Sequence, residues 1–319
     1  MSTGMFFHIH HLTFSTTLNP DMVANVVSEY LNHDYHFINR GFYSYSTRYQ
    51  FGDIGSVHFT DGRHECTVEI KGTGCELVGK DILLDLYQAL EGKATRLDLA
   101  VDGCPFEPMK IKEHTGCGYG VEAQNVRTKV NRRGFKEFTE FASQGISIGS
   151  RQSMRFARIY NYRLDDEGKN ITRFELELKK NAANRNLEKI ISSSKEDFNS
   201  LVMGIIRDFI DFVEPGGDTN ISRSNIATWW QDFIDGAERV SVKLVDTPVK
   251  LIKNTVKHVY NNAPSFVVAM NYEMTKHNIT QEKFFELFTN HGFSGLKKKH
   301  KLLMSVMENP ERHPQFLGA

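Results

Sequence analysis

The sequence predicts an α+β fold in which a central antiparallel sheet is flanked by helices, with a mostly helical C-terminal region. Two observations support this prediction. Up to about residue 180, short runs alternate apolar and polar side chains, which is the period of half-buried strands. Beyond that point the apolar residues recur at the period of a helix. We therefore expect one domain over residues 1–190 and a helical region over residues 191–319.

The first half of the chain mixes strand and helix signals. Pro20 fits the first turn of a helix, and Asp61 and Gly62 form a typical hairpin turn signal. The expected strands cover 6–14, 37–51 (as a pair), 55–59 and 65–71, and the expected helices cover 20–31 and 80–90.

From about residue 137, the sequence predicts one short helix and three more strands, and after residue 180 it predicts only helices. A short helix is expected to end near 137–141, and a hairpin of strands over 145–148 and 155–162 turns around Gly149. A polar turn at 165–170 precedes a strand over 172–179. The helices expected after it cover 182–191, 195–213, 225–234, 247–260, 265–277 and 281–291. No internal repeat is visible.

Composition excludes several classes of protein. The 39 basic and 39 acidic residues give a formal net charge of zero, so the chain is not a uniformly basic DNA-binding protein. The four cysteines have no C-x-x-C spacing, which favours reduced structural thiols over a zinc site. We expect a cytoplasmic protein without a membrane span, because no long apolar run and no signal-peptide pattern occur.

Two predicted strands, over 96–102 and 173–179, each place charged residues on one face and aliphatic residues on the other. If the strands pair, four carboxylates converge, namely Asp98, Asp102, Glu175 and Glu177. Converging carboxylates repel each other unless a cation joins them, so a Mg²⁺ or Mn²⁺ site is one interpretation. The other interpretation is a solvated strand face on which arginine and lysine pair with the acids.

The predicted strand over 155–162 places Arg158, Tyr160 and Tyr162 on one face. A tyrosine beside arginines and a metal has the features of a nucleophile that attacks a phosphate. The alternative is a tyrosine that packs in the sheet with its hydroxyl group hydrogen-bonded. His8 and His10 share a face of the first strand in the same way, and they are either metal ligands or structural histidines.

Several groups suit phosphate binding. The turn around residues 149–153 offers backbone amides, two hydroxyl groups and a guanidinium, and a cluster of lysines lies near the C-terminus. A polar hairpin loop and a solvated helix face are the alternatives. The expected DNA- or phosphate-binding residues are Ser150, Arg151, Ser153, Arg155, Lys297, Lys298 and Lys299.

Five short motifs, in this order and spacing, resemble the replication initiation factor family. That family includes rolling-circle initiators of plasmids, relaxases of conjugative elements and replication proteins of filamentous phages. The motifs cover 71–75, 95–102, 148–153, 158–161 and 173–179, and the segment 229–233 is similar to a further family element.

The resemblance implies a metal-dependent site-specific endonuclease and strand transferase. Such a protein nicks one strand of a duplex origin with a tyrosine, keeps the 5′-phosphate on that tyrosine, and later rejoins the strand. The family tyrosine corresponds to Tyr160, and the strand acids correspond to the predicted metal ligands. The family lysine two residues after the tyrosine is Tyr162 here, so either tyrosine, or both in turn, could act.

The implied partners are duplex origin DNA, single-stranded DNA and a host helicase and polymerase, and a homodimer is one possible state. Two other functions remain open at this point. A non-catalytic origin-binding or regulatory protein would bind DNA without either tyrosine. A nuclease that uses water would leave a free 5′-phosphate and no protein–DNA adduct.

Overall fold

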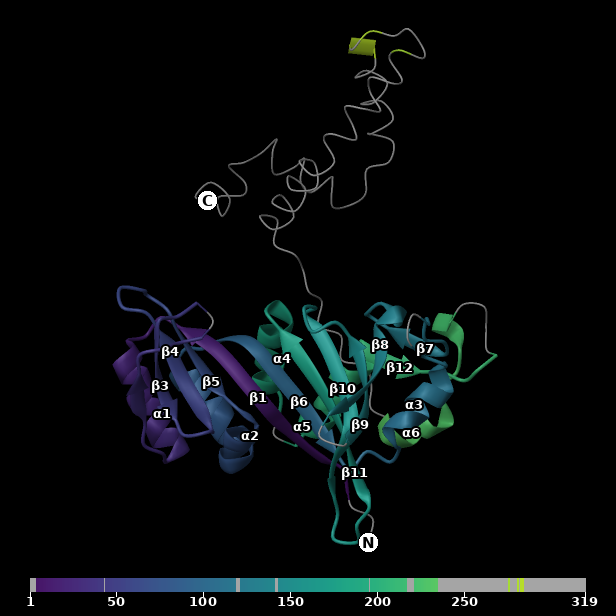
Figure 1. The fold of residues 1–319 in the computed structure, drawn as a ribbon, viewed down its shortest axis with the longest axis horizontal. Coiled ribbons are helices and arrows are strands. Elements are labelled where there is room, and N and C mark those ends of the chain that lie inside the picture. The colour runs from purple at the N-terminus through teal and green to yellow at the C-terminus, as the bar shows by residue number, and fades with distance from the viewer. Residues whose placement is uncertain are drawn as a thin grey trace. The chain divides into compact units, whose positions relative to one another are not determined.

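Ten strands form one antiparallel sheet in the computed structural model, with the order β2-β3-β4-β5-β1-β6-β11-β10-β9-β8 (Figure 1). The structure describes residues 4–42, 44–118, 121–140, 143–194, 196–216 and 221–234, with the isolated positions 275, 280, 282 and 283. The strands of this sheet are β1 (Phe6–Thr16), β2 (His36–Ile38), β3 (Thr47–Phe51), β4 (Gly55–Phe59), β5 (Cys66–Ile70), β6 (Lys93–Asp102), β8 (Phe135–Glu140), β9 (Ser143–Gly149), β10 (Arg155–Leu164) and β11 (Asn170–Lys179).

Six helices and a small two-stranded sheet complete the described part. The small sheet pairs β7 (Val126–Thr128) with β12 (Ile210–Phe212). The helices are α1 (Pro20–Leu31), α2 (Gly72–Ala89), α3 (Pro108–Thr115), α4 (Asn181–Ser192), α5 (Phe198–Phe209) and α6 (Thr228–Ile234). None of these helices has the length and apolar character that crossing a membrane requires.

The large sheet consists of two halves with the same order of elements. The first half runs β1, α1, β2 to β5, α2, and the second half runs β6, α3, β8 to β11, α4, with β7 inserted after α3. In each half the last strand pairs with the first, and β1 pairs with β6 at the centre. The structure therefore contains a repeat that the sequence did not reveal.

The two faces of the large sheet differ in chemistry. Aliphatic and aromatic residues such as Leu99, Phe174 and Leu176 are fully buried on one face, against which α4, α5 and the second part of α2 pack. The other face carries the charged residues of β6, β10 and β11 together with polar residues of β1, β4 and β5. We call this second face the polar face.

The alternation patterns predicted most strands correctly, but three helix predictions were wrong. Residues 137–141 belong largely to β8, an edge strand that pairs with β9 and buries Phe135. The helix expected over 195–213 ends at Phe209, and the apolar run then continues as β12, because a short apolar run fits a buried strand equally well. Helix α2 begins eight residues early, at Gly72, and is kinked at Gly79, where φ is 75°.

The chain divides into two compact units, Met1–Lys243 and Leu244–Ala319. The first unit includes α5, β12 and α6, so it extends past residue 190, where the sequence predicted a domain boundary. The helices predicted beyond residue 243 and the lysine cluster lie outside the described residues, apart from the four isolated positions.

Trp230 anchors α6 in the first unit. Its side chain is fully buried, its Nε1 donates a hydrogen bond of 3.1 Å to Asp211, and its ring packs against Phe174 of the large sheet and Phe212 of β12. The segment after residue 190 is thus attached to the sheet through an aromatic cluster.

We expect the substitution Trp230→Ala to lower the free energy of unfolding by about 3–5 kcal/mol, because it leaves a large cavity in this cluster. Trp230→Phe retains most of the packing and should cost less. Urea denaturation of the full chain measures both values. If Trp230→Ala lowers the free energy of unfolding by less than about 1 kcal/mol, the packing of α6 contributes little to the stability of the first unit.

Candidate active site

Strands β6 and β11 pair in the register that brings the predicted acids together. Glu177 lies opposite Asp98, and Arg173 lies opposite Asp102. All four side chains are buried on the polar face. The period-two pattern of both strands therefore predicted correctly which residues share this face.

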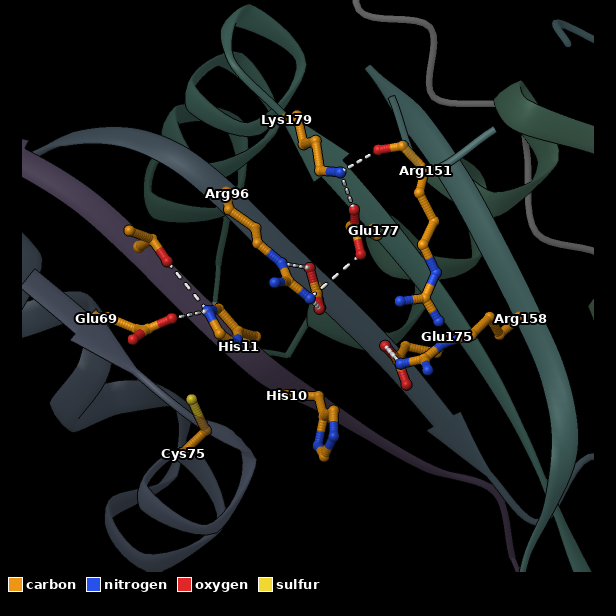
Figure 2. A network of polar contacts seen from close by, with 12 residues as sticks. His10, His11, Glu69, Cys75, Arg96, Arg151, Arg158, Glu175, Glu177 and Lys179 are labelled. Carbon is orange, nitrogen blue, oxygen red and sulfur yellow. Dashed lines mark hydrogen bonds and ion pairs between the residues drawn. The ribbon is translucent and has the colours of Figure 1, made fainter. Parts of the chain in front are cut away.

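The four predicted carboxylates each have a cationic partner, and Figure 2 shows those of Glu175 and Glu177. Arg96 lies 2.6 Å from Asp98 and 3.2 Å from Glu177, and Glu177 also pairs with Lys179. Burial raises the pKa of Asp98 to about 6, although the hydrogen bond from Arg96 opposes this shift. All four predicted metal ligands thus take part in ion pairs, but they are buried and do not form the solvated strand face that was the alternative interpretation.

Arg173 lies at the centre of the site. Its side chain is 1% exposed, and it donates hydrogen bonds of 2.5 and 2.8 Å to the two carboxylate oxygens of Asp102. The guanidinium also lies 3.3 Å from His10 and 3.5 Å from Glu76. The ring of Tyr162 stacks on it, with its centroid 3.5 Å from Cζ. One cation therefore contacts groups from four different elements.

Tyr160 and Arg158 both contact Glu175. The Tyr160 hydroxyl donates a hydrogen bond of 3.0 Å to one carboxylate oxygen, and Arg158 lies 2.6 Å from the other. Burial raises the pKa of Tyr160 above its ordinary value, and the Glu175 charge adds to this shift. Burial also opposes ionisation of Glu175, but Arg158 outweighs it and lowers the pKa of Glu175. The result is a neutral phenol that donates to an ionised carboxylate.

A second cluster consists of His8, His10 and Glu76, whose ligand atoms lie within 4.8 Å of one another. The register of β1 shifts between Ile9 and His11, so His10 is an extra residue in a bulge. Bulges often re-aim side chains near functional sites. At this bulge His8 and His10 both lie close to Glu76 of α2.

The histidines of this cluster have the chemistry of metal ligands. Burial lowers the pKa of His8 to about 4 and also lowers the pKa of His10, so both imidazoles are neutral at pH 7. Neither ring nitrogen of His8 has a hydrogen-bond partner, although the residue is buried. Two neutral imidazoles and a carboxylate form a donor set that suits a divalent transition metal.

Glu76 is a site residue that the sequence did not predict. It comes one residue after the motif over 71–75, and the predicted helix began only at Lys80. Gly72 allows the first turn of α2 to approach β1, because a Cβ at this position would stand 2.5 Å from the His10 ring. An acid in the first turns after a glycine-rich segment was the available signal.

The predicted phosphate-binding residues do not all gather at the tyrosine. Ser150 and Ser153 form the tight turn between β9 and β10, and the Arg151 side chain extends from this turn toward Arg158 (Figure 2). Arg155 pairs with Leu178 in the sheet and so lies on the apolar face, where it contacts Asp208 at 3.4 Å. Lys297, Lys298 and Lys299 lie outside the described residues.

The four cysteines are free and buried, in agreement with the expected structural thiols. Burial raises the pKa of Cys66 to about 11, which keeps its thiol protonated.

Comparisons with known proteins agree with the resemblance seen in the motifs. The family model described as replication initiation factor matches residues 92–284. A rolling circle replication initiator protein from Geobacillus stearothermophilus has a similar fold, with a TM-score of 0.57 and 19% sequence identity. The match covers 76% of this chain and 100% of that protein. Comparison with curated proteins gave no significant match.

We expect Arg173→Met to lower the free energy of unfolding by about 3–5 kcal/mol, because it leaves the buried charge of Asp102 without a partner. The double variant Arg173→Met with Asp102→Leu removes both charges and should recover much of this loss. Urea denaturation at pH 7 tests both. If the single variant is as stable as the wild type, the pair does not organise the site.

Proposed function

Because the chain belongs to the replication initiation factor family, we propose that it initiates rolling-circle DNA replication by nicking one strand of an origin with a tyrosine. The hydrogen bond from Tyr160 to Glu175 is the observation that carries this proposal. It joins a nucleophile to a base on the polar face of the sheet, next to an arginine and a metal-type ligand set.

The chemistry assigned to these residues is a transesterification. The Tyr160 oxygen attacks the phosphorus, and its proton passes to Glu175, an ionised carboxylate at hydrogen-bond distance. The bond from phosphorus to the 3′-oxygen breaks, and that oxygen leaves as a hydroxyl group with the proton that Glu175 accepted from Tyr160. Arg158 stabilises the negative charge that develops on the phosphate. The 5′-phosphate stays on the tyrosine, so the strand can be rejoined.

Tyr162 has a different environment from Tyr160. Its ring stacks on Arg173, and it stands where the family pattern has a lysine. This stacking keeps a guanidinium next to the side chain that replaces the family lysine. We assign nucleophilic attack to Tyr160 and a positioning role to Tyr162, and the variants below separate these roles.

His8, His10 and Glu76 would hold the divalent metal. The metal, when bound, withdraws charge from the phosphate and lowers the barrier to attack. The unpartnered nitrogens of His8 support this assignment. Imidazole ligands favour Mn²⁺ over Mg²⁺, which prefers oxygen atoms. Asp98, Asp102 and Glu177 then serve to hold the arginines and lysine of the face.

Duplex origin DNA and single-stranded DNA are the substrates in this proposal. Three further points stay predictions. They are an interaction with the host helicase and polymerase, a homodimeric state, and a DNA-binding role for the C-terminal region. Origin DNA as substrate agrees with the cytoplasmic location expected from the sequence.

The decisive experiment is a nicking assay on supercoiled plasmid with Mn²⁺, analysed on a denaturing gel that reveals protein–DNA adducts. We expect an adduct from the wild type and from Tyr162→Phe, and none from Tyr160→Phe, because among the described residues it is the Tyr160 hydroxyl that donates to a carboxylate, Glu175, able to accept its proton. The plasmid must carry the cognate origin.

The other outcomes distinguish the competing functions. An adduct that disappears only in Tyr162→Phe would assign the attack to Tyr162. Nicks with a free 5′-phosphate and no adduct would show hydrolysis by water. Binding without any cleavage would support a non-catalytic origin-binding protein.

Metal binding has a readout that does not depend on activity. We expect Glu76→Gln and His8→Ala to weaken Mn²⁺ binding by at least about 10-fold, the lower end of the effect of an outer-shell partner. Isothermal titration calorimetry on the full chain measures it. Glu69→Gln is the matched control, because Glu69 lies near His11 on the same face but outside the cluster. If Glu175→Gln abolishes Mn²⁺ binding and Glu76→Gln does not, the metal ligands are the acids of β6 and β11 and not the histidine cluster.

A further inference from the structure

We propose that the first half of the polar face binds the bases and phosphates of single-stranded DNA through two aromatic–arginine pairs, Phe42 with Arg48 and Tyr45 with Arg63. This inference rests on the proposed function, which makes DNA the ligand, and it adds a second contact region far from Tyr160.

Both aromatic rings are fixed on the polar face by contacts to the sheet. The backbone N–H of Phe42 donates a hydrogen bond of 3.3 Å to His58 of β4, and the two rings lie 5.7 Å apart. The Tyr45 hydroxyl lies 3.1 Å from the Thr67 hydroxyl of β5. Phe42 nevertheless remains 49% exposed. A large apolar ring that is held in place and open to solvent can stack on a base without losing much conformational entropy.

An arginine lies against each ring. The Cζ atom of Arg48 stands 4.7 Å from the Phe42 centroid, and that of Arg63 stands 4.9 Å from the Tyr45 centroid. Their hydrogen bonds go to neutral groups, namely the Gln50 side chain for Arg48 and the Ser44 carbonyl for Arg63.

Within the described part of the chain, neither Arg48 nor Arg63 forms an ion pair, in contrast to Arg96, Arg158 and Arg173. Two uncompensated cations beside aromatic rings are complementary to a ligand that is both anionic and flat. A DNA strand with unpaired bases combines these properties, because phosphates alternate with stacking surfaces.

The repeat places this region on the same face as the tyrosine. Ser56 lies opposite Glu69 in the first half, as Arg158 lies opposite Glu175 in the second. His58, two residues after Ser56, lies on the same face, and the Phe42 ring covers it. Phe42 and Tyr160 therefore both lie on the polar face.

The distance between the aromatic–arginine pairs and Tyr160 is short enough for one DNA strand to contact both. Strands β4 and β10 are five positions apart in the sheet order, which corresponds to about 24 Å at ~4.8 Å per strand. About seven nucleotides of a stacked strand span this distance at ~3.4 Å each. That length lies within the site sizes of known single-strand binding folds.

The test measures binding of a fluorescently labelled single strand of about 20 nucleotides to the full chain by anisotropy. We expect Phe42→Leu to weaken binding about fivefold or more, since it removes a stacking surface but keeps an apolar cover over His58. Arg63→Gln should lower the slope of log K against log salt by about 0.7, the contribution of one phosphate contact.

Phe37→Leu is the matched control. Phe37 is 56% exposed on the neighbouring strand β2, but its pairing with Tyr49 places it on the opposite face of the sheet. It should bind DNA like the wild type. Thermal unfolding of each variant checks that the fold is retained, and Arg63 is exposed, so its substitution does not disturb the core.

Two results would overturn the inference: wild-type protein that does not bind the single strand, or Phe42→Leu and Arg63→Gln variants that bind within twofold of the wild type. The adduct assay keeps the proposed function separate. If the wild type forms the tyrosine adduct while these variants bind normally, only this inference fails. If the variants lose binding but no adduct forms in the wild type, only the nicking function fails.

Discussion

The buried guanidinium of Arg173 is the constraint on which the site depends. A cation in the interior is tolerated only when carboxylates and other acceptors surround it. Asp102 supplies two hydrogen bonds, and Glu76, His10 and the Tyr162 ring occupy the remaining directions. Because the partners of Arg173 come from β1, β6, β10 and α2, these four elements must lie around β11 for its charge to be compensated. The geometry of the candidate metal ligands is therefore partly a consequence of satisfying one charge.

Much of the charged face could be predicted from the sequence, because period-two alternation determines which residues of a strand share a face. The positions of Asp98, Glu175 and Tyr160 follow from this rule. The contacts between strands do not, since Arg96 of β6 contacts Glu177 of β11 only because the two strands are neighbours. A linear sequence does not state the order of strands in a sheet.

Other features of the fold could not be predicted from local sequence patterns, because they also depend on how strands and helices pack. Edge pairing with β9 made residues 135–140 a strand despite their helical composition, and the early start of α2 placed Glu76 in the site. The repeat of the two halves is visible in the strand order alone. The strands of the two halves differ in length and residue type, so alternation patterns cannot align them.

The bulge at His10 has a consequence for how such a chain can change. Without the extra residue, the pairings on either side of it, Ile9 with Leu99 and His11 with Asp98, would join into one regular ladder. Deletion of the single codon for His10 would therefore remove one residue of the candidate metal cluster and leave a regular pairing of β1 with β6. An in-frame deletion in the first strand could thus change the site without rearranging the sheet.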